Sequence, residues 1–262
     1  MTDLSVPARP LLARHDLAAL ALEGLVRADR YRATTAMRLR APVADIHAEA
    51  DAASERIDQL LFGEAFDVLE HRDGRAWGQA RRDGVVGWVD LTVLAPGTLR
   101  PTHSVSAVDA DLPLNALVTD PSEPDLRLRP IGDFERDPVT VAQRLIGTPH
   151  ALGARSSIAT DCSGLVQQAL LACGLSGARR AHEQAQLGHA VDRDDARRGD
   201  LVIWLSRVEG QSWTGHSAIM LDEATLIHAT GFHGAVVVEA LAAADARCLS
   251  DGFAPAVFRR VV

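Results

Sequence analysis

Three side chains in the second half of the sequence have the chemistry to break an amide bond: the thiol of Cys162 and the imidazoles of His216 and His228. A thiolate is a strong nucleophile, and a neighbouring imidazole can take the thiol proton and later give one to the leaving amine. A further polar group that holds this imidazole in one orientation completes the arrangement. The three residues can act together only if the fold brings them to one place.

The segment around Cys162 predicts the first turn of a helix. Apolar residues recur at helical spacing up to Cys173, which favours a helix from Ser163 to Ala172. Asp161 is a typical N-cap, and the free N–H groups and positive dipole end of a helix start favour an ionised thiol. With an imidazole nearby, the thiolate can become the main form of Cys162. A buried structural cysteine is the alternative, and it is the better interpretation of Cys173 within the apolar stripe.

The two histidines lie in neighbouring predicted strands. His216 stands at the start of the run 217–221, directly after a glycine, and His228 lies in the run 226–229. If the two runs form a hairpin, the imidazoles lie side by side at one edge of the sheet, where His228 can orient His216. A single strand histidine is more often a satisfied core or surface residue, and the chain has ten histidines. A zinc site made by Cys162 and both histidines is a further alternative, although no fourth ligand stands at a suggestive spacing.

Residues 138–262 predict an α+β domain that carries these three side chains. Asp137 and Pro138 are typical of a helix start, and the helix is expected to run from Val139 to Ile146. An antiparallel sheet with helices to one side is expected from the apolar runs and short turns that follow. Its strands are predicted at residues 201–205, 217–221, 226–229, 236–238 and 256–262.

The first half of the chain predicts a small β-barrel over residues 31–97. Short apolar runs are separated by glycine-containing turns, and Asp73-Gly74 between two such runs is a strong hairpin signal. Leucines at helical spacing predict a helical arm over residues 1–30. Prolines interrupt residues 98–137, which favours a reduced second barrel or a structured linker.

The overall composition is that of a globular protein, and it argues against some classes of partner. The 262 residues carry a net charge of -8, which argues against nucleic acid because phosphate binding needs clustered lysines and arginines. No run approaches the roughly 18 apolar residues of a membrane span, and the N-terminus does not resemble a secretion signal. Three cysteines do not suggest a disulfide framework. We expect a cytoplasmic protein with no membrane span, no cofactor and no metal.

The second half resembles the NlpC-type, papain-like cysteine peptidases of bacterial cell-wall turnover. This resemblance implies a papain-like domain in which Cys162 is the nucleophile, His216 the base and His228 the orienting residue. The motifs that carry it are Asp161-Cys162-Ser163-Gly164-Leu165-Val166-Gln167, Arg198-Gly199-Asp200-Leu201-Val202, Gly215-His216-Ser217-Ala218-Ile219 and Ile227-His228-Ala229.

The first half resembles the bacterial SH3-like domains that precede this peptidase in one subgroup, through residues 59–64 and 83–89. Members of the subgroup cut the bond between γ-D-glutamate and the diamino acid of murein stem peptides. Those that act in recycling require a free N-terminal L-alanine. The resemblance implies that Glu64, Asp161 and Ser163 bind the N-terminal end of the substrate.

Three positions depart from the pattern of that subgroup. His150 stands where a tyrosine helps to hold the oxyanion, and an imidazole can donate a similar hydrogen bond. Val85 stands where a tyrosine of the barrel enters the active-site groove. Arg180 stands where an aspartate commonly helps to bind the substrate amine, so its positive charge is expected to weaken binding of a free amine. We expect an intact catalytic machinery with altered substrate-binding residues.

The expected function is hydrolysis of the γ-D-glutamyl to diamino acid bond in a small murein-derived peptide. Two alternatives use the same fold. One is a catalytically weak or inactive module that binds muropeptides, and measurements of binding and turnover separate it from an enzyme. The other is a thiol acyltransferase that passes the acyl group to an amine instead of water, which product analysis with an added amine detects.

Overall fold

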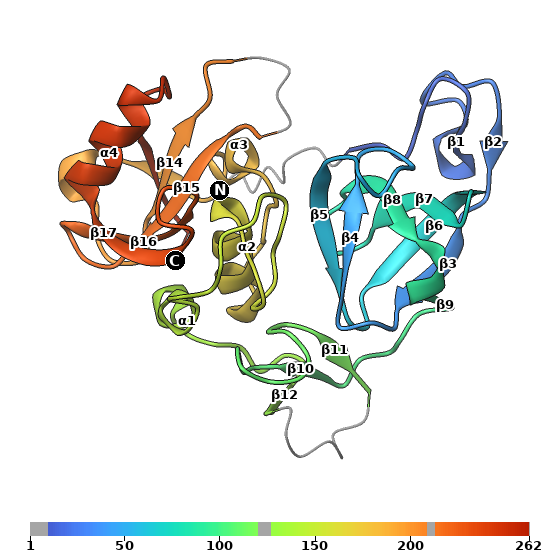
Figure 1. Ribbon diagram of the computed structural model, residues 1–262, viewed down its shortest axis with the longest axis horizontal. Coiled ribbons are helices and arrows are strands. Elements are labelled where there is room, and N and C mark those ends of the chain that lie inside the picture. The colour runs from blue at the N-terminus through green and yellow to red at the C-terminus, as the bar shows by residue number, and fades with distance from the viewer. Residues whose placement is uncertain (1–9, 120–126, 209–212, 262) are drawn as a thin grey trace. The chain divides into compact units, whose positions relative to one another are not determined.

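The computed structural model describes residues 10–119, 127–208 and 213–261. They form two compact units that meet in the chain between Ile131 and Gly132 (Figure 1). Each unit has antiparallel sheets and a buried apolar core of its own.

The unit up to Ile131 is built on a seven-stranded sheet with the strand order β5-β4-β8-β7-β6-β3-β9, in which all pairings are antiparallel. Large apolar side chains such as Leu39, Ile46, Leu60 and Phe66 fill its core. The strands are β3 (Thr35–Leu39), β4 (Val43–His47), β5 (Arg56–Leu61), β6 (Ala65–Arg72), β7 (Arg75–Ala80), β8 (Val86–Asp90) and β9 (Leu94–Pro96).

The hairpin predicted at Asp73-Gly74 joins β6 to β7. Arg72 pairs with Arg75 across the turn, and the two residues between them have φ angles of 51° and 76°. Positive φ at both central residues is what a two-residue hairpin turn requires, and Asp-Gly tolerates it. The sequence prediction for this turn is confirmed.

The helical arm predicted over residues 1–30 differs from the structure. Residues 1–9 lie outside the described part of the chain, and residues 10–32 form the short strands β1 (Ala18–Ala19) and β2 (Tyr31–Arg32) and the 3₁₀ turn η1 (Leu20–Leu22). Leu12 and Leu17 pack instead in a cluster with Trp77 and Trp88 of the barrel. Burial against these two rings outweighs the weak helix preference of a short segment.

Residues 98–131 contribute a small sheet of three strands to the same unit. Strand β10 (His103–Val105) pairs antiparallel with β11 (Leu117–Val118) on one side and β12 (Leu128–Pro130) on the other. Residues 120–126 of the expected barrel or linker lie outside the described part of the chain.

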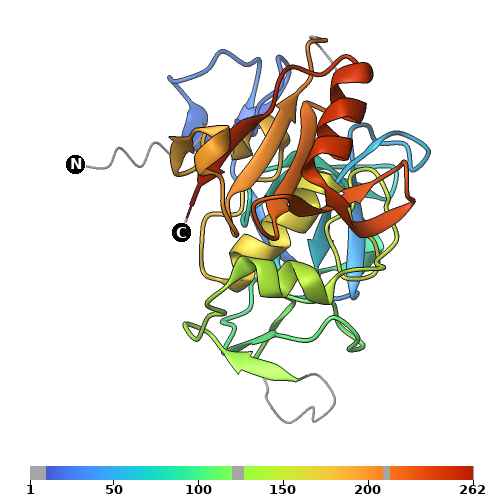
Figure 2. The ribbon, with the colours of Figure 1, turned by 90° about the vertical axis from the view of Figure 1, so that its left-hand side faces the viewer.

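The unit from Gly132 onwards contains a six-stranded antiparallel sheet with the order β13-β18-β14-β15-β16-β17. Strand β18 lies between β13 and β14 although it follows all the other strands in the sequence (Figure 2, dark red). The five predicted strands are formed, with ends that differ by a few residues. The bounds are β13 (His189–Val191), β14 (Leu201–Leu205), β15 (Gly215–Met220), β16 (Thr225–Thr230), β17 (Ala235–Ala240) and β18 (Val257–Arg260).

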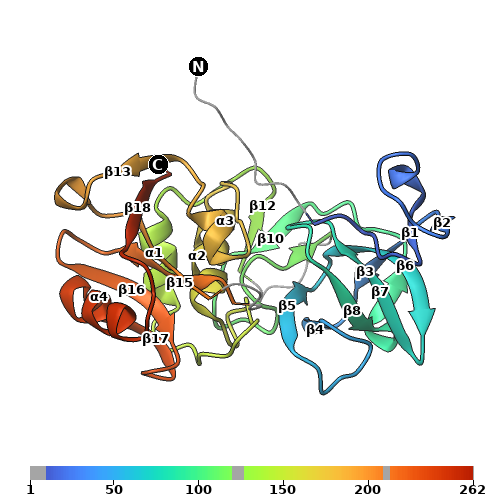
Figure 3. The ribbon, with the colours of Figure 1, turned by 90° about the horizontal axis from the view of Figure 1, so that it is seen from above.

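Helices cover both faces of this sheet, whereas the sequence predicted them on one side. Helices α1 (Pro138–Arg144) and α2 (Cys162–Ala172) contact β15 and β16 from one side, and α4 (Leu241–Ser250) packs on the other (Figure 3). The short helix α3 (Ala181–Gln184) contacts β14 and β15. Helix α4 was missed because most of its buried residues, such as Ala244 and Cys248, are small and give a weak apolar stripe.

The starts of α1 and α2 form as the sequence predicts. The side chain of Asp137 accepts a hydrogen bond from the backbone N–H of Val139, and that of Asp161 accepts one from Gly164. Among the described helices, none is both long and apolar enough to cross a bilayer.

Candidate active site

Cys162 is the first residue of α2, and its sulfur lies against strand β15. The Sγ atom is 3.9 Å from the carbonyl oxygen of Gly215, and the backbone N–H groups of Ser217 and Ser163 donate hydrogen bonds to the sulfur. Gly215 and Ser217 flank His216 in the strand. The helix start therefore delivers the sulfur to the strand position that carries the expected base.

His216 and His228 are brought together by the hairpin of β15 and β16. Ile219 pairs with Ile227 in this hairpin, and the Nε2 atom of His216 lies 2.8 Å from the Nδ1 atom of His228. The two rings meet edge to face at 73°. The predicted contact between the two imidazoles is therefore present, and it leaves the Nδ1 atom of His216 as the ring nitrogen not engaged by His228.

A carboxylate that the sequence analysis did not single out lies behind His228. The Oε2 atom of Glu239, on β17, is 2.9 Å from the Nε2 atom of His228. Arg247, on α4, contacts the same carboxylate at both oxygens, with distances of 2.6 Å and 2.7 Å. His216, His228, Glu239 and Arg247 therefore form a continuous row of contacts across β15, β16, β17 and α4.

Both reacting groups are neutral in the resting site, which corrects the expectation of a thiolate. Burial, reinforced by the negative charge of Asp161, raises the pKa of the Cys162 thiol to about 12. Burial, reinforced by the charges of His228 and Arg247, lowers the pKa of His216 to about 3. The loss of water around the sulfur outweighs the effect of the helix N–H groups, because desolvation always disfavours the charged form.

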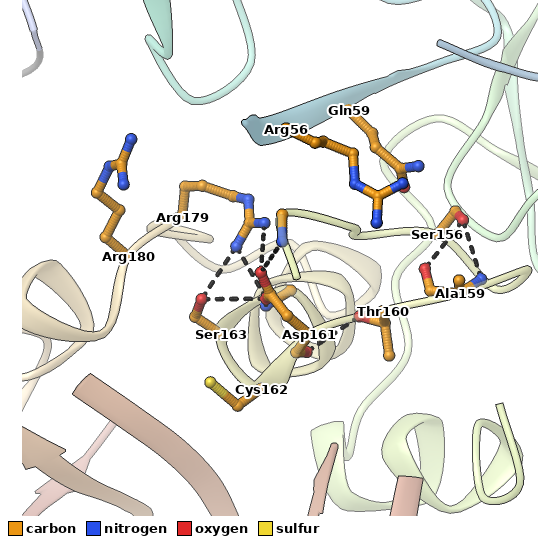
Figure 4. A network of polar contacts seen from close by, with 12 residues as sticks. Arg56, Gln59, Ser156, Ala159, Thr160, Asp161, Cys162, Ser163, Arg179 and Arg180 are labelled. Carbon is orange, nitrogen blue, oxygen red and sulfur yellow. Dashed lines mark hydrogen bonds and ion pairs between the residues drawn. The ribbon is translucent and has the colours of Figure 1, made fainter. Parts of the chain in front are cut away.

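Asp161 is held by a buried network at the start of α2 (Figure 4). Arg179 donates to both of its carboxylate oxygens, at 3.0 Å and 2.8 Å, and also to the hydroxyl of Ser163 at 2.9 Å. Backbone N–H groups of Gly153 and Gly164 donate to the same carboxylate. Burial raises the pKa of Asp161, but the charge and hydrogen bonds of Arg179, with the backbone N–H groups, lower it further, so that it lies below its usual value. The pair is therefore ionised, and its two charges neutralise each other.

Arg180, which the sequence analysis placed beside the substrate amine, does not join this network. Its side chain points away from Asp161 and Ser163 in Figure 4, and its backbone N–H donates to Glu183 at the start of α3. Its neighbour Arg179 instead supplies a positive charge beside Asp161, and this charge neutralises the carboxylate without reversing the local charge. The two arginines could not be told apart in sequence, because only the turn before α3 decides which one faces α2.

The segments that hold this geometry match known families. Residues 46–94 match the bacterial dipeptidyl-peptidase SH3 domain, and residues 147–245 match the NlpC/P60 family. Residues 147–245 therefore form an NlpC/P60 domain. The fold of the chain is that of an SH3-like barrel followed by a papain-like NlpC/P60 domain, as the sequence predicted.

Curated relatives of this chain are named as peptidases. Murein DD-endopeptidase MepS/murein LD-carboxypeptidase of Escherichia coli is 30% identical over 92 residues, which are 35% of this chain and 47% of that protein. γ-D-glutamyl-L-lysine dipeptidyl-peptidase of Bacillus subtilis is 31% identical over 83 residues, which are 32% of this chain and 28% of that protein. The chain thus spans less than half the length of these two relatives.

A solved structure shares the fold over most of the chain. The crystal structure of an NlpC/P60 family protein from Bacillus cereus superposes with a TM-score of 0.70. The match covers 87% of this chain and 99% of that chain, with 14% sequence identity. At this identity the likeness concerns the fold alone.

The remaining predicted substrate-binding residues have defined places in the structure. His150 lies in the segment before α2, with its imidazole over Gly231, and burial lowers its pKa. Glu64 is buried inside the barrel unit, where it accepts from the backbone of Leu61 and pairs with Arg82 at 2.8 Å. The roles of His150 and Glu64 toward a substrate stay predictions.

Val85 corrects the expectation that this position lines a groove. It is 4% exposed and packs in the core of the barrel, because an apolar side chain in this place gains more from burial than from contact with water. Asp161 and Ser163 also differ from exposed substrate-binding groups, since Arg179 engages both. Among the described residues, no three histidine, cysteine or acidic side chains come together as ligands for a metal ion.

Proposed function

We propose that the protein is a cysteine endopeptidase that hydrolyses the bond between γ-D-glutamate and the diamino acid of a murein-derived stem peptide. One observation carries the proposal: the sulfur of Cys162 lies 3.9 Å from the carbonyl oxygen of Gly215, the residue before His216, and Nε2 of His216 is 2.8 Å from Nδ1 of His228. Two relatives, one named as a murein DD-endopeptidase and one as a γ-D-glutamyl-L-lysine dipeptidyl-peptidase, support the substrate class.

The first half of the reaction forms a thioester. The Nδ1 atom of His216 takes the thiol proton as the sulfur of Cys162 attacks the γ-carbonyl carbon. The backbone N–H of Cys162 and the imidazole of His150 donate hydrogen bonds to the oxyanion. The carbonyl then reforms, the C–N bond breaks, and the imidazolium of His216 gives its proton to the leaving amine.

The second half returns the enzyme to its starting state. His216 takes a proton from a water molecule, whose oxygen attacks the thioester carbonyl. The C–S bond breaks, and the proton held by His216 returns to the sulfur, so that one water is consumed and one peptide bond is cut. Because the thiol and imidazole are neutral at rest, proton transfer accompanies attack on the substrate instead of preceding it.

The network around Asp161 bears on which peptides are accepted. The carboxylate that would attract a substrate amine is already neutralised by the guanidinium of Arg179. A substrate whose N-terminus is blocked therefore loses little binding energy here. We propose that the protein accepts stem peptides with free and with blocked N-termini in the cytoplasm.

The proposal is tested with L-Ala-γ-D-Glu-diamino acid peptides and mass spectrometry of the products. Hydrolysis at the γ-D-glutamyl bond is expected for the wild-type protein and for Cys173→Ala, and none for Cys162→Ala or after alkylation of Cys162 with iodoacetamide. Turnover that survives alkylation of Cys162 contradicts the proposal. Tight binding by calorimetry without turnover would instead assign a peptide-binding module, and transfer to an added amine would assign an acyltransferase.

A further inference from the structure

The carboxylate of Glu239 lies between an imidazole and a guanidinium in a poorly hydrated place. Its Oε2 atom is 2.9 Å from Nε2 of His228, and Arg247 contacts both oxygens. The side chain of His228 is fully buried, and those of Glu239 and Arg247 are 13% and 19% exposed. An ion pair so shielded from water keeps most of its electrostatic effect on the imidazole beside it.

We propose that Glu239, held by Arg247, is a positioning residue that sets the tautomers of His228 and His216. In the resulting tautomer, Nδ1 of His216 has the free lone pair that can take the thiol proton. The inference rests on the proposed function, because it concerns the base of that reaction. Glu239 contacts neither the sulfur nor His216 directly and acts through His228.

The tautomers follow from the donors and acceptors along the row. An ionised carboxylate only accepts, so the ring nitrogen of His228 that faces Glu239, Nε2, carries the proton. The Nδ1 atom of a neutral His228 then has a lone pair and accepts from Nε2–H of His216. With its proton on Nε2, His216 has a free lone pair on Nδ1, which is the nitrogen that can take the thiol proton.

The opposite arrangement would disable the base. If the proton of His228 were on Nδ1, it would point at Nε2 of His216, and a neutral His216 would carry its own proton on Nδ1. The contact between His228 and Glu239 is a close charge contact without the alignment of a full hydrogen bond. The negative charge alone still favours a proton on the nearer nitrogen, Nε2.

Arg247 keeps Glu239 in the form that this task requires. Its paired hydrogen bonds lower the pKa of Glu239 to about 2, so the carboxylate stays ionised throughout the physiological range. The guanidinium also lies 4.8 Å from the ring of the exposed Phe232, which adds a second contact that holds it in place.

Glu239 and Arg247 act on the basicity of the imidazoles with opposite signs. The carboxylate raises the pKa values of His216 and His228, and the guanidinium lowers them. The other titratable or charged groups that face the two rings are Cys162 from α2, His150 from the segment before it, and His233, whose Nε2 atom lies 3.7 Å from Glu239. Of these three, His233 contacts Glu239 directly, so a substitution at Glu239 removes that contact as well.

The test uses the full chain with Glu239→Gln, Glu239→Leu and Arg247→Met, each compared with a charge-matched control. Glu223→Gln removes a carboxylate from the exposed turn between β15 and β16, and Arg193→Met removes a 48% exposed guanidinium that pairs with Asp245 on α4. The readouts are the pH profile of kcat/KM and nitrogen NMR of the histidine rings, which reports the tautomer of each imidazole without turnover. Urea unfolding identifies variants that fail to fold.

Loss of the carboxylate is expected to reduce kcat by about 10- to 100-fold, the size of effect seen for outer partners that orient metal-bound imidazoles. The acid limb of the kcat/KM profile, which follows the pKa of His216, should move to lower pH in Glu239→Gln and to higher pH in Arg247→Met. In folded Glu239→Leu, the nitrogen spectra should show a proton appearing on Nδ1 of His216. The two controls should match the wild type in each readout.

The outcomes separate this inference from the proposed function. An inactive wild-type protein whose spectra change as described refutes the reaction and leaves the role of Glu239 standing. An active wild-type protein whose Glu239→Leu variant keeps its tautomers and its kcat overturns the role of Glu239. Shifts of the acid limb in the same direction for Glu239→Gln and Arg247→Met also overturn the role of Glu239. Opposite charges acting on the imidazole predict opposite shifts, whereas a merely structural pair predicts the same change in both variants.

Discussion

The guanidinium of Arg179 forms a two-pronged ion pair with the carboxylate of Asp161, the residue directly before the proposed nucleophile. Both side chains are buried, at 4% and 10% exposure. The pair joins the start of α2 to the segment before α3, two elements that contact the same strand β15. It therefore fixes the position of Cys162 relative to His216 and also sets the local charge to zero.

Removal of Arg179 should destabilise the NlpC/P60 domain, because it leaves a buried carboxylate without its countercharge. Arg179→Met is expected to lower the free energy of unfolding by about 3–5 kcal/mol, measured by urea denaturation. The double variant Asp161→Asn/Arg179→Met should recover part of this loss. Arg198→Met, which breaks an exposed pair with Asp137, should lose less than about 1 kcal/mol. Equal losses in the two single variants would argue against a buried pair.

Peptides with free and acetylated N-termini should be cut with similar efficiency. Since Arg179 already neutralises Asp161, a substrate ammonium gains little there, and we expect kcat/KM values within about 10-fold, or about 1.4 kcal/mol. A panel of matched stem peptides measured by mass spectrometry gives the ratio. Strict dependence on the free amine would show that Arg179 leaves Asp161 when substrate binds.

The stability of the domain should fall as the pH drops below about 6.5. The pKa values of His216 and His228 are about 3 and about 4 in the folded protein, against an ordinary 6.5. Between these values the unfolded chain binds more protons, so each imidazole removes up to about 1.4 kcal/mol per pH unit as the solution is acidified.

Urea denaturation at a series of pH values measures this slope. The variant His216→Gln/His228→Gln should show a shallower slope than the wild type whatever its absolute stability. The matched control, His182→Gln/His189→Gln, removes two exposed histidines of the same domain and should keep the wild-type slope. An unchanged slope in the first variant would mean that the two imidazoles are not buried neutral.

Gly164 should tolerate no side chain, because a Cβ atom there would overlap the carbonyl oxygen of Ala154 and crowd the hydroxyl of Thr160. Gly164→Ala is expected to lower stability by about 1–3 kcal/mol. It should also reduce kcat, since α2 must shift and Cys162 is its first residue. Ala172→Gly, at the far end of the same helix, should cost about 1 kcal/mol without changing kcat. A fully active Gly164→Ala would show that the position of α2 is not critical.

The parts of the site that the sequence predicts are those with a local signature. Asp161 followed by an apolar stripe marks the helix start at Cys162, and the two apolar runs with a short turn mark the hairpin that joins His216 to His228. Each of these elements depends on residues close in the chain, so periodicity and capping are enough to place them.

The parts that the sequence does not predict depend on packing between distant segments. Glu239 meets His228 only because β17 pairs with β16 in a particular register, and Arg247 reaches Glu239 only because α4 folds back over the sheet. The neutral thiol of Cys162 is a further example, since its desolvation comes from surrounding elements and not from its own helix. The one sequence signal by which Glu239 could have been found is its place as a charged residue directly after the apolar run Val236–Val238.

The place of β18 inside the sheet affects how the domain can be made in the cell. Until residues 257–260 have left the ribosome, the apolar strand β14 has one unpaired edge, beside the strand that holds His216. An open edge of this kind pairs readily with other chains. Final closure of the sheet must therefore come after most of the domain has been translated, and until then the edge of β14 stays open to pairing with other chains.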